Sequence, residues 1–193
     1  MVTSAMTMDA DSGDALVLRA RTDRDALGRL YDQHYASVLR YCIHRLFDRD
    51  MAEDVTSAVF LVVARQVRDF TGQTRQDFAN WLYAIATRQI NAHLSKTHRR
   101  QELLADAVDR QRIRICSGID SEEAHKLDWP RLYQAIAALS PGEQAVITLR
   151  SFENLPYEQV ATIVGLKAAT ARVTYHRALV KLRAHLGEPS EGV

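Results

Sequence analysis

The chain has 193 residues and a formal net charge of +1, and 47% of its residues are hydrophobic and 25% are charged. These values are ordinary for a globular protein and exclude wholesale disorder, and charged residues interrupt every apolar run that could span a bilayer. The two cysteines, Cys42 and Cys116, fit neither a metal-ligand spacing nor a disulfide framework. We therefore expect a reduced, cytoplasmic protein with no metal site and no cofactor.

Apolar residues recur with helical spacing throughout the chain, which predicts an all-α protein of two small helical domains joined by a flexible linker. The first residues are small, polar and acidic, unlike a secretory signal, and predict a mobile tail. The expected boundaries are 1–22 for this tail, 23–100 for the first domain, 101–127 for the linker, 128–187 for the second domain and 188–193 for a C-terminal tail.

The first domain is expected to be a compact unit of three helices. These helices are expected at about 25–47, 51–69 and 78–99, with a loop over 70–77 between the second and the third. In the second domain a helix is expected from Trp129 to Leu139. Ser140 is expected to cap the next helix, because Pro141 and Glu143 follow it in the first turn.

The segment from Tyr157 to Arg183 has the pattern of a helix-turn-helix. Gly165 supplies the left-handed residue that ends its first helix, and the small Ala161 allows the second helix to cross closely. The start of the second helix would then enter the DNA major groove. Residues 167–187 contain no Asp or Glu, which suits contact with phosphate. A solvated basic helix on the outside of a bundle is the alternative.

Residues on the outward side of this second helix are candidates for contact with duplex DNA. Arg172 is the strongest candidate, either as a phosphate clamp or as a bidentate reader of guanine. Ala169 and Val173 suit contact with thymine methyl groups, whereas His176 and Arg177, one turn further on, suit the backbone. The full set is Lys167, Ala169, Thr170, Arg172, Val173, His176 and Arg177.

The whole chain from Leu27 to Leu186 resembles the extracytoplasmic-function (ECF) group of the sigma-70 family of bacterial RNA polymerase sigma factors. Four stretches carry the resemblance: AEDVTSAVFLVV, WLYAIATRQINAHL, ALSPGEQAVITLRSFENLPYEQVATIVG and HRALVKLR. The resemblance implies a non-enzymatic protein that binds the clamp helices of core RNA polymerase, directs it to promoter DNA and helps to open the duplex. Its region 2 would capture the −10 element as single strand, and its region 4 would read the −35 element as duplex. Whether an anti-sigma factor also binds is left open.

Capture of a single strand requires a basic groove and platforms for unstacked bases. The third helix offers both, and the loop over 70–77 lies where the family forms a pocket for a flipped base. Trp81 is in register with Phe78 and Ile85, so a place in the core is an equal alternative for it. Arg99 and Arg100 have the alternative role of favouring a helix C-terminus. The candidates for contact with the −10 strand are Trp81, Tyr83, Arg88, Asn91, Lys96, Arg99 and Arg100.

The exposed side of the first two helices is the expected surface for the polymerase, with carboxylates facing a basic partner and two apolar anchors. Phe60 has a place in the core as its equal alternative. The candidates are Asp48, Asp50, Glu53, Asp54, Phe60 and Leu61. The chain departs from the usual family residues at Ser57, Ala58, Ala64 and Thr174, which puts the strength of polymerase docking and the −35 preference in doubt.

A transcription regulator that binds duplex DNA without polymerase is the competing interpretation. An enzyme is disfavoured, because no catalytic triad, metal site or Gly-rich phosphate loop stands out in the sequence.

Overall fold

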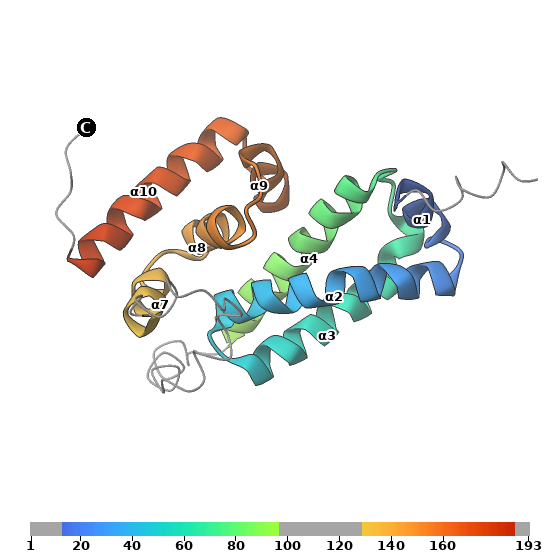
Figure 1. Cartoon of the computed structure of the whole chain (residues 1–193), viewed down its shortest axis with the longest axis horizontal. Coiled ribbons are helices and arrows are strands. Elements are labelled where there is room, and N and C mark those ends of the chain that lie inside the picture. The colour runs from blue at the N-terminus through green and yellow to red at the C-terminus, as the bar shows by residue number, and fades with distance from the viewer. Residues whose placement is uncertain (1–12, 97–128, 188–193) are drawn as a thin grey trace, which may run out of the picture.

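The computed structural model describes residues 13–96 and 129–187 (Figure 1). Every regular element in these ranges is a helix, which confirms the predicted all-α class. The first range contains α1 (Gly13–Arg19), α2 (Arg24–Leu46), α3 (Arg49–Gln66), the 3-10 turn η1 (Val67–Asp69) and α4 (Arg75–Lys96). The second contains α7 (Trp129–Ala137), α8 (Pro141–Ile147), the π-helical turn η3 (Thr148–Phe152), α9 (Tyr157–Val164) and α10 (Ala168–Leu186). The expected linker and C-terminal tail lie outside the described residues.

Three helices, α2, α3 and α4, run side by side and enclose the core of the first domain (Figure 1). Val38, Val59 and Leu82, one from each helix, are fully buried there. Tyr31 of α2 is 41% exposed, because its ring lies at the rim of this core and meets Phe60 edge to face, with 4.6 Å between the ring centroids. None of the described helices combines the length and apolar character needed to cross a membrane.

Local capping sets the sharp turn between α2 and α3. Phe47 ends α2 in the left-handed region, with a φ of 57°, and donates its N–H to the Ile43 carbonyl. Asp48 then begins α3, because its carboxylate accepts a hydrogen bond from the Met51 N–H at 2.9 Å. The carboxylate of Asp48, a candidate polymerase contact, is thus already engaged in capping.

Helix α1 departs from the mobile tail predicted for residues 1–22. Its Leu16 and Val17 are 2% and 0% exposed and pack into the core of the first domain. Asp14 also accepts a hydrogen bond from the Arg75 N–H at 2.7 Å, which ties α1 to the start of α4. The sequence analysis missed this helix because its few apolar residues stand within a polar, acidic stretch. Seven residues also give too short a periodic pattern to recognise.

The second domain follows the predicted local signals closely. Ser140 and Glu143 form a capping box at the start of α8, as the sequence pattern suggested for the cap. Gly165 ends α9 with a φ of 72°, a left-handed conformation that residues with a Cβ rarely adopt. Gln144, only 1% exposed, donates its side-chain amide to the carbonyls of Ile136, Ala137 and Leu139 and so fixes α8 to the end of α7.

The two domains are packed against each other rather than apart. Helix α9 contacts α4, and the π-helical turn η3 contacts α2. Leu149 and Val160 of the second domain, both 0% exposed, belong to the same cluster of buried side chains as Leu82 of the first. The interface therefore removes apolar surface from water in the way that a domain core does.

A buried carboxylate joins the two domains at this interface. The side chain of Glu153, which follows η3, is 1% exposed. It accepts two hydrogen bonds from the Arg40 guanidinium, at 3.2 and 2.6 Å, and one from the Tyr83 hydroxyl at 3.0 Å. A buried carboxylate is tolerated only when its charge is paired and its oxygens accept hydrogen bonds, and both donors come from the first domain.

A buried histidine lies beside this contact. The ring of His44, in α2, is stacked on Phe152 with 4.4 Å between the centroids, and its Nδ1 is 3.3 Å from the Tyr133 hydroxyl. Burial first, and the positive charge of Arg40 second, lower the pKa of His44 to about 4. The imidazole is therefore neutral at neutral pH, and the interface is built for its uncharged form.

The burial of α1 is tested by two leucines in the same short helix. We expect Leu16→Ala to lower the free energy of unfolding by about 2–5 kcal/mol, because it leaves a cavity in the core. Leu18→Ala is the matched control: Leu18 is 45% exposed, so its truncation should change stability by less than about 0.5 kcal/mol. The measurement is chemical denaturation followed by circular dichroism. Two equally neutral variants would mean that residues 13–19 are not docked.

The buried neutral His44 predicts a loss of stability in mild acid. In the unfolded chain its imidazole titrates near 6.5, and in the folded chain at about 4. Between these pH values the unfolded chain holds a proton that the folded chain lacks, so the free energy of unfolding falls as the pH drops through this window. The full loss is on the order of 3 kcal/mol, because one pKa unit corresponds to about 1.4 kcal/mol.

The control for this prediction is His44→Phe, which keeps the stacked ring but cannot titrate. Denaturation curves between pH 7 and pH 4 should show a shallower decline for the variant. Some decline should persist, because burial also lowers the pKa of His34. Parallel declines in both proteins would contradict a buried, neutral His44.

Candidate nucleic-acid interface

The helix-turn-helix presents its predicted DNA-reading residues to solvent. The inward residues Ala171, Ala178 and Leu182 of α10 are buried, and Tyr175 is half-buried. The candidates on the outward side are all exposed: Lys167, Ala169, Thr170, Arg172, Val173, His176 and Arg177. The sequence pattern therefore predicted the orientation of this helix correctly. Contact of these residues with DNA stays a prediction.

Tyr157 holds two arginines beside the start of α10. The guanidinium carbons of Arg150 and Arg172 each lie 5.1 Å from the centroid of its ring. Such cation–π contacts restrict the long side chain of Arg172 before any DNA is bound. Arg150 also donates a hydrogen bond to the Leu155 carbonyl at 3.2 Å. The sequence analysis missed Tyr157 and Arg150 as members of this site, because the turn that places them next to α10 cannot be seen in helical periodicity.

Not every basic residue of α10 is available to DNA. The ammonium of Lys181 forms an ion pair with Glu143 at 2.6 Å. Arg183 is exposed in the last turn. The positive charge that is left at the start of the helix therefore comes from Lys167, Arg172 and Arg177.

A hydrogen-bonded loop precedes α4, and an aromatic cluster lies where this loop meets the first turns of the helix. Trp81 is half-buried and stacked on Phe70, with 4.7 Å between the ring centroids, so it belongs to the rim of the core and keeps an open edge. Asp77 accepts hydrogen bonds from the N–H groups of Gln73 and Thr74, at 3.0 and 3.1 Å. Hydrogen bonds from Thr74, and then from Gln73, lower the pKa of the Asp77 carboxyl. The loop over 70–74 is therefore held in one conformation by charge-assisted bonds.

Two candidates for the −10 strand are engaged inside the protein. Tyr83 is 6% exposed and donates its hydroxyl to Glu153, and burial followed by the charge of Glu153 raises its pKa. Asn91 is half-buried and accepts a hydrogen bond from Arg45 at 3.0 Å. Neither is an open platform for a base in this arrangement. The sequence analysis did not foresee this, because the partners are distant in the chain.

Of the remaining −10 candidates, the structure describes the side chain of one. Arg88 is exposed on α4. Lys96 is the last residue of that helix, and its side chain is outside the described part of the protein, as are Arg99 and Arg100.

The candidate polymerase surface is partly exposed and partly core. Asp50 and Asp54 are exposed on α3, and Leu61 is a large apolar side chain that is 52% exposed. Glu53 forms an ion pair with Arg49 at 2.9 Å. Phe60 is 8% exposed and packs against Tyr31 and Tyr35. Its core alternative is thus the correct one.

No cluster of three or more His, Cys, Asp or Glu side chains could hold a metal ion within residues 13–96 and 129–187. Cys42 is buried, and burial raises the pKa of its thiol to about 11, so it is not a reactive thiolate.

Comparison with known proteins identifies both halves of the chain. Residues 30–100 match the family described as Sigma-70 region 2, and residues 130–182 match the family described as Sigma-70, region 4. The ECF RNA polymerase sigma factor BldN of Streptomyces coelicolor is 34% identical over 179 residues, which cover 88% of this chain and 66% of that protein. The chain thus spans about two thirds of the length of this relative.

Two solved structures share the fold. One is CnrH in complex with the cytosolic domain of CnrY, with a TM-score of 0.66, 20% identity and coverage of 93% of this chain and 100% of that one. The other is the sigma factor RpoE of Bartonella quintana in complex with the anti-sigma factor NepR, with a TM-score of 0.60, 20% identity and coverage of 83% and 96%. A regulator that acts without polymerase would not need a region 2. The chain belongs to the ECF group of the sigma-70 family and is a sigma factor for transcription initiation by RNA polymerase.

Proposed function

We propose that the second domain reads the −35 element through the start of α10, while the first domain captures the −10 strand at the loop over 70–74 and the exposed edge of α4. The observation that carries this proposal is the outward side of α10. All its candidate residues are exposed, and no acid occurs between Lys167 and Gly187. A helix start of this kind fits the major groove.

Arg172 is the residue on which sequence reading is proposed to depend most. Its guanidinium is planar and presents a fork of donors to the two acceptors on the guanine edge. The Tyr157 ring restricts this fork before binding, so less side-chain entropy is lost when the contact forms. Val173, 48% exposed, is an apolar residue on the same side and suits a thymine methyl group.

The first domain is proposed to bind the polymerase through α3 and the strand through α4. Exposed carboxylates at Asp50 and Asp54 suit a basic partner, and Leu61 beyond them offers an apolar anchor. Clamp helices of the core polymerase are the proposed counterpart. For the strand, Trp81 supplies an aromatic edge beside a rigid loop, and Arg88 supplies positive charge further along α4. An unstacked base can stack on such an aromatic surface, and its phosphate can lie against the positive charge.

The packed arrangement of the two domains cannot read both promoter elements at once. Elements centred near −35 and −10 are about 25 base pairs apart, which is about 85 Å along B-DNA at 3.4 Å per pair. In this structure α9 and α4 are in direct contact. Residues 97–128 separate the two described ranges, and 32 residues of chain can reach at most about 105–115 Å. We infer that the domain contact at Glu153 is a closed state, and that promoter binding opens it.

An anti-sigma factor is a further proposed partner. The RpoE protein with this fold was solved bound to the anti-sigma factor NepR, and a closed pair of domains is a surface that such a factor could hold. The proposed location is the cytoplasm, where core polymerase and promoter DNA are found. If the tagged chain, isolated from its own cells, carried no protein that inhibits its transcription in vitro, an anti-sigma partner would be contradicted.

Arg172→Ala tests the reading of the −35 element. Sigma-bound polymerase would be used to select sequences from a random duplex library, and the recovered −35 motif would be compared between proteins. We expect loss of preference at one or two positions and a weakening of about 1–3 kcal/mol, or roughly 5- to 150-fold, because a bidentate base contact is removed. Arg183→Ala removes the same charge farther along α10 and should leave the motif intact. An unchanged motif with Arg172→Ala would show that this side chain does not read sequence.

Glu153→Ala tests the closed state. The change leaves the buried Tyr83 hydroxyl without its acceptor and Arg40 without its ion pair, which should weaken the domain contact by about 1–3 kcal/mol. Small-angle X-ray scattering of the free chain should then give a larger radius of gyration. Glu158→Ala is the control, because Glu158 is an exposed acid on α9 and its loss should leave the radius unchanged. Equal radii for both variants and the parent would mean that Glu153 does not hold the domains together.

A further inference from the structure

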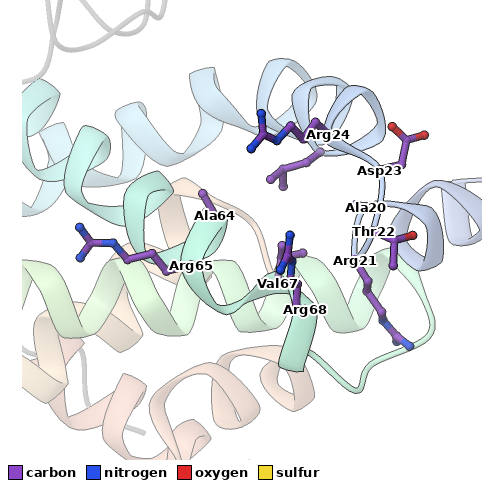
Figure 2. A pocket seen from close by; sticks show the side chains of 10 residues that line it. Ala20, Arg21, Thr22, Asp23, Arg24, Ala64, Arg65, Val67 and Arg68 are labelled. Carbon is purple, nitrogen blue, oxygen red and sulfur yellow. The ribbon is translucent and has the colours of Figure 1, made fainter.

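A cavity lined by arginines lies at one end of the first domain. Its volume is about 480 Å³, within the range of pockets that bind small molecules and single nucleotides. One wall is the turn between α1 and α2, which brings Arg21 and Arg24, and the other is the end of α3 with η1, which brings Arg65 and Arg68 (Figure 2). All lining residues belong to the first domain, so the packed second domain does not contribute to it.

The positive charge of this cavity is not neutralised within the protein. Asp23 is the one acidic residue that lines it. Its carboxylate is already used, because it caps α2 and forms an ion pair with Arg19 at 2.9 Å, and the hydrogen bond from Arg19 lowers its pKa. Within the described part of the chain, Arg24, Arg65 and Arg68 have no hydrogen-bond or ion-pair partner. Several guanidinium groups around one hollow attract an anion, and their planar forks match the oxygens of a phosphate.

Arg21 connects the cavity to the loop that is proposed to capture a base. Figure 2 shows its side chain turned away from the cavity toward the segment that follows η1. Its guanidinium donates a hydrogen bond to the Gly72 carbonyl and lies 5.9 Å from the centroid of the Phe70 ring. Its Nε is buried and has no hydrogen-bond partner among the described residues. The cavity and the loop over 70–74 therefore share one residue.

The floor of the cavity suits a sugar rather than a bare ion. Leu27, Ala64 and Val67 line it together with the arginines. Apolar side chains beside a charged rim resemble the environment of a nucleotide, whose phosphate is charged and whose deoxyribose is largely apolar. The small side chain of Ala64 leaves this side of the cavity open.

We propose that this cavity is a phosphate-binding subsite for single-stranded DNA, in which Arg24 and Arg68 hold the backbone next to a base captured at the loop over 70–74. The inference rests on the proposed function of the first domain. It adds a second grip on the strand, away from α4 and accessible while the two domains are packed together. A free phosphate compound has the same chemistry, and the experiment separates the two sources.

The test measures binding of the full chain to a fluorescein-labelled (dT)12 strand over a series of salt concentrations. Each phosphate contact contributes about 0.7 to the slope of log K against log salt for a single strand. Arg24→Ala with Arg68→Ala should therefore lower the slope by about 1.4. The control is Arg49→Ala with Arg183→Ala, which removes the same charge. Arg49 lies at the opposite end of α3 and Arg183 at the end of α10, so the control should keep the slope of the parent protein.

Arg88→Ala, on the proposed strand surface of α4, distinguishes failure of the cavity proposal from failure of strand capture by the first domain. If Arg88→Ala lowers the slope but the Arg24 and Arg68 pair does not, the cavity is not a strand subsite, and strand capture by the first domain still stands. If no variant lowers the slope, or the parent chain does not bind the strand, both the subsite and strand capture are contradicted.

Sodium pyrophosphate at constant ionic strength distinguishes the two sources of phosphate. If it binds the parent chain more tightly than (dT)12, and the Arg24 and Arg68 pair abolishes that binding, the cavity holds a small phosphate compound and the strand proposal is overturned. If pyrophosphate displaces (dT)12 only weakly, as an ordinary salt of the same ionic strength does, the result supports the single strand as the ligand. Both double variants should have the melting curve of the parent protein, measured by circular dichroism. The reason is that all four replaced residues are exposed: Arg24, Arg68, Arg49 and Arg183.

Discussion

The relation between the two domains depends on one buried carboxylate. Glu153 is shielded from water and has its oxygens satisfied by Arg40 and Tyr83, which belong to the other domain. A carboxylate left in that position without these donors would cost several times the thermal energy, so the contact is favourable only when the domains meet in this register. The apolar contacts around it, including Leu149 and Val160 against the first domain, stabilise the domain contact but do not fix its geometry. The hydrogen bonds of Glu153 fix how the two domains are oriented.

This contact has opposite consequences for the two proposed DNA surfaces. The outward side of α10 is exposed while the domains are packed, so the duplex-reading helix is ready in the closed state. The strand surface is only half available, because Tyr83 is used in the domain contact and Asn91 holds Arg45. Opening would release Tyr83 but leave Trp81 and the loop over 70–74 as they are, because those are held by bonds within the first domain. The same chain can thus present duplex contacts before it presents all of its strand contacts.

Much of the fold could be predicted from the sequence because local physics decides it. Gly165, Ser140 and the outward residues of α10 follow from backbone conformation, capping and helical periodicity, and each requires only a few neighbouring residues. Tyr83, Asn91 and Phe60 could not be assigned in this way, because what buries them lies far along the chain or on a neighbouring helix. Helix α1 was missed for a related reason: a two-turn helix has no stable pattern of its own, and its place is decided by the core that it covers.

The most direct test is a distance measured between the two domains, free and bound to core polymerase. Spin labels would be placed at Leu18 and Val180, which are 45% and 63% exposed, in a chain whose Cys42 and Cys116 are replaced by Ser. Pulsed electron–electron double resonance should give one narrow distance distribution for the free chain, because the packed domains fix the two labels, and a distribution shifted to longer values when core polymerase and promoter DNA are added. A distribution that stays unchanged in the complete transcription complex would contradict the account, and so would a free chain in which the domains are already apart.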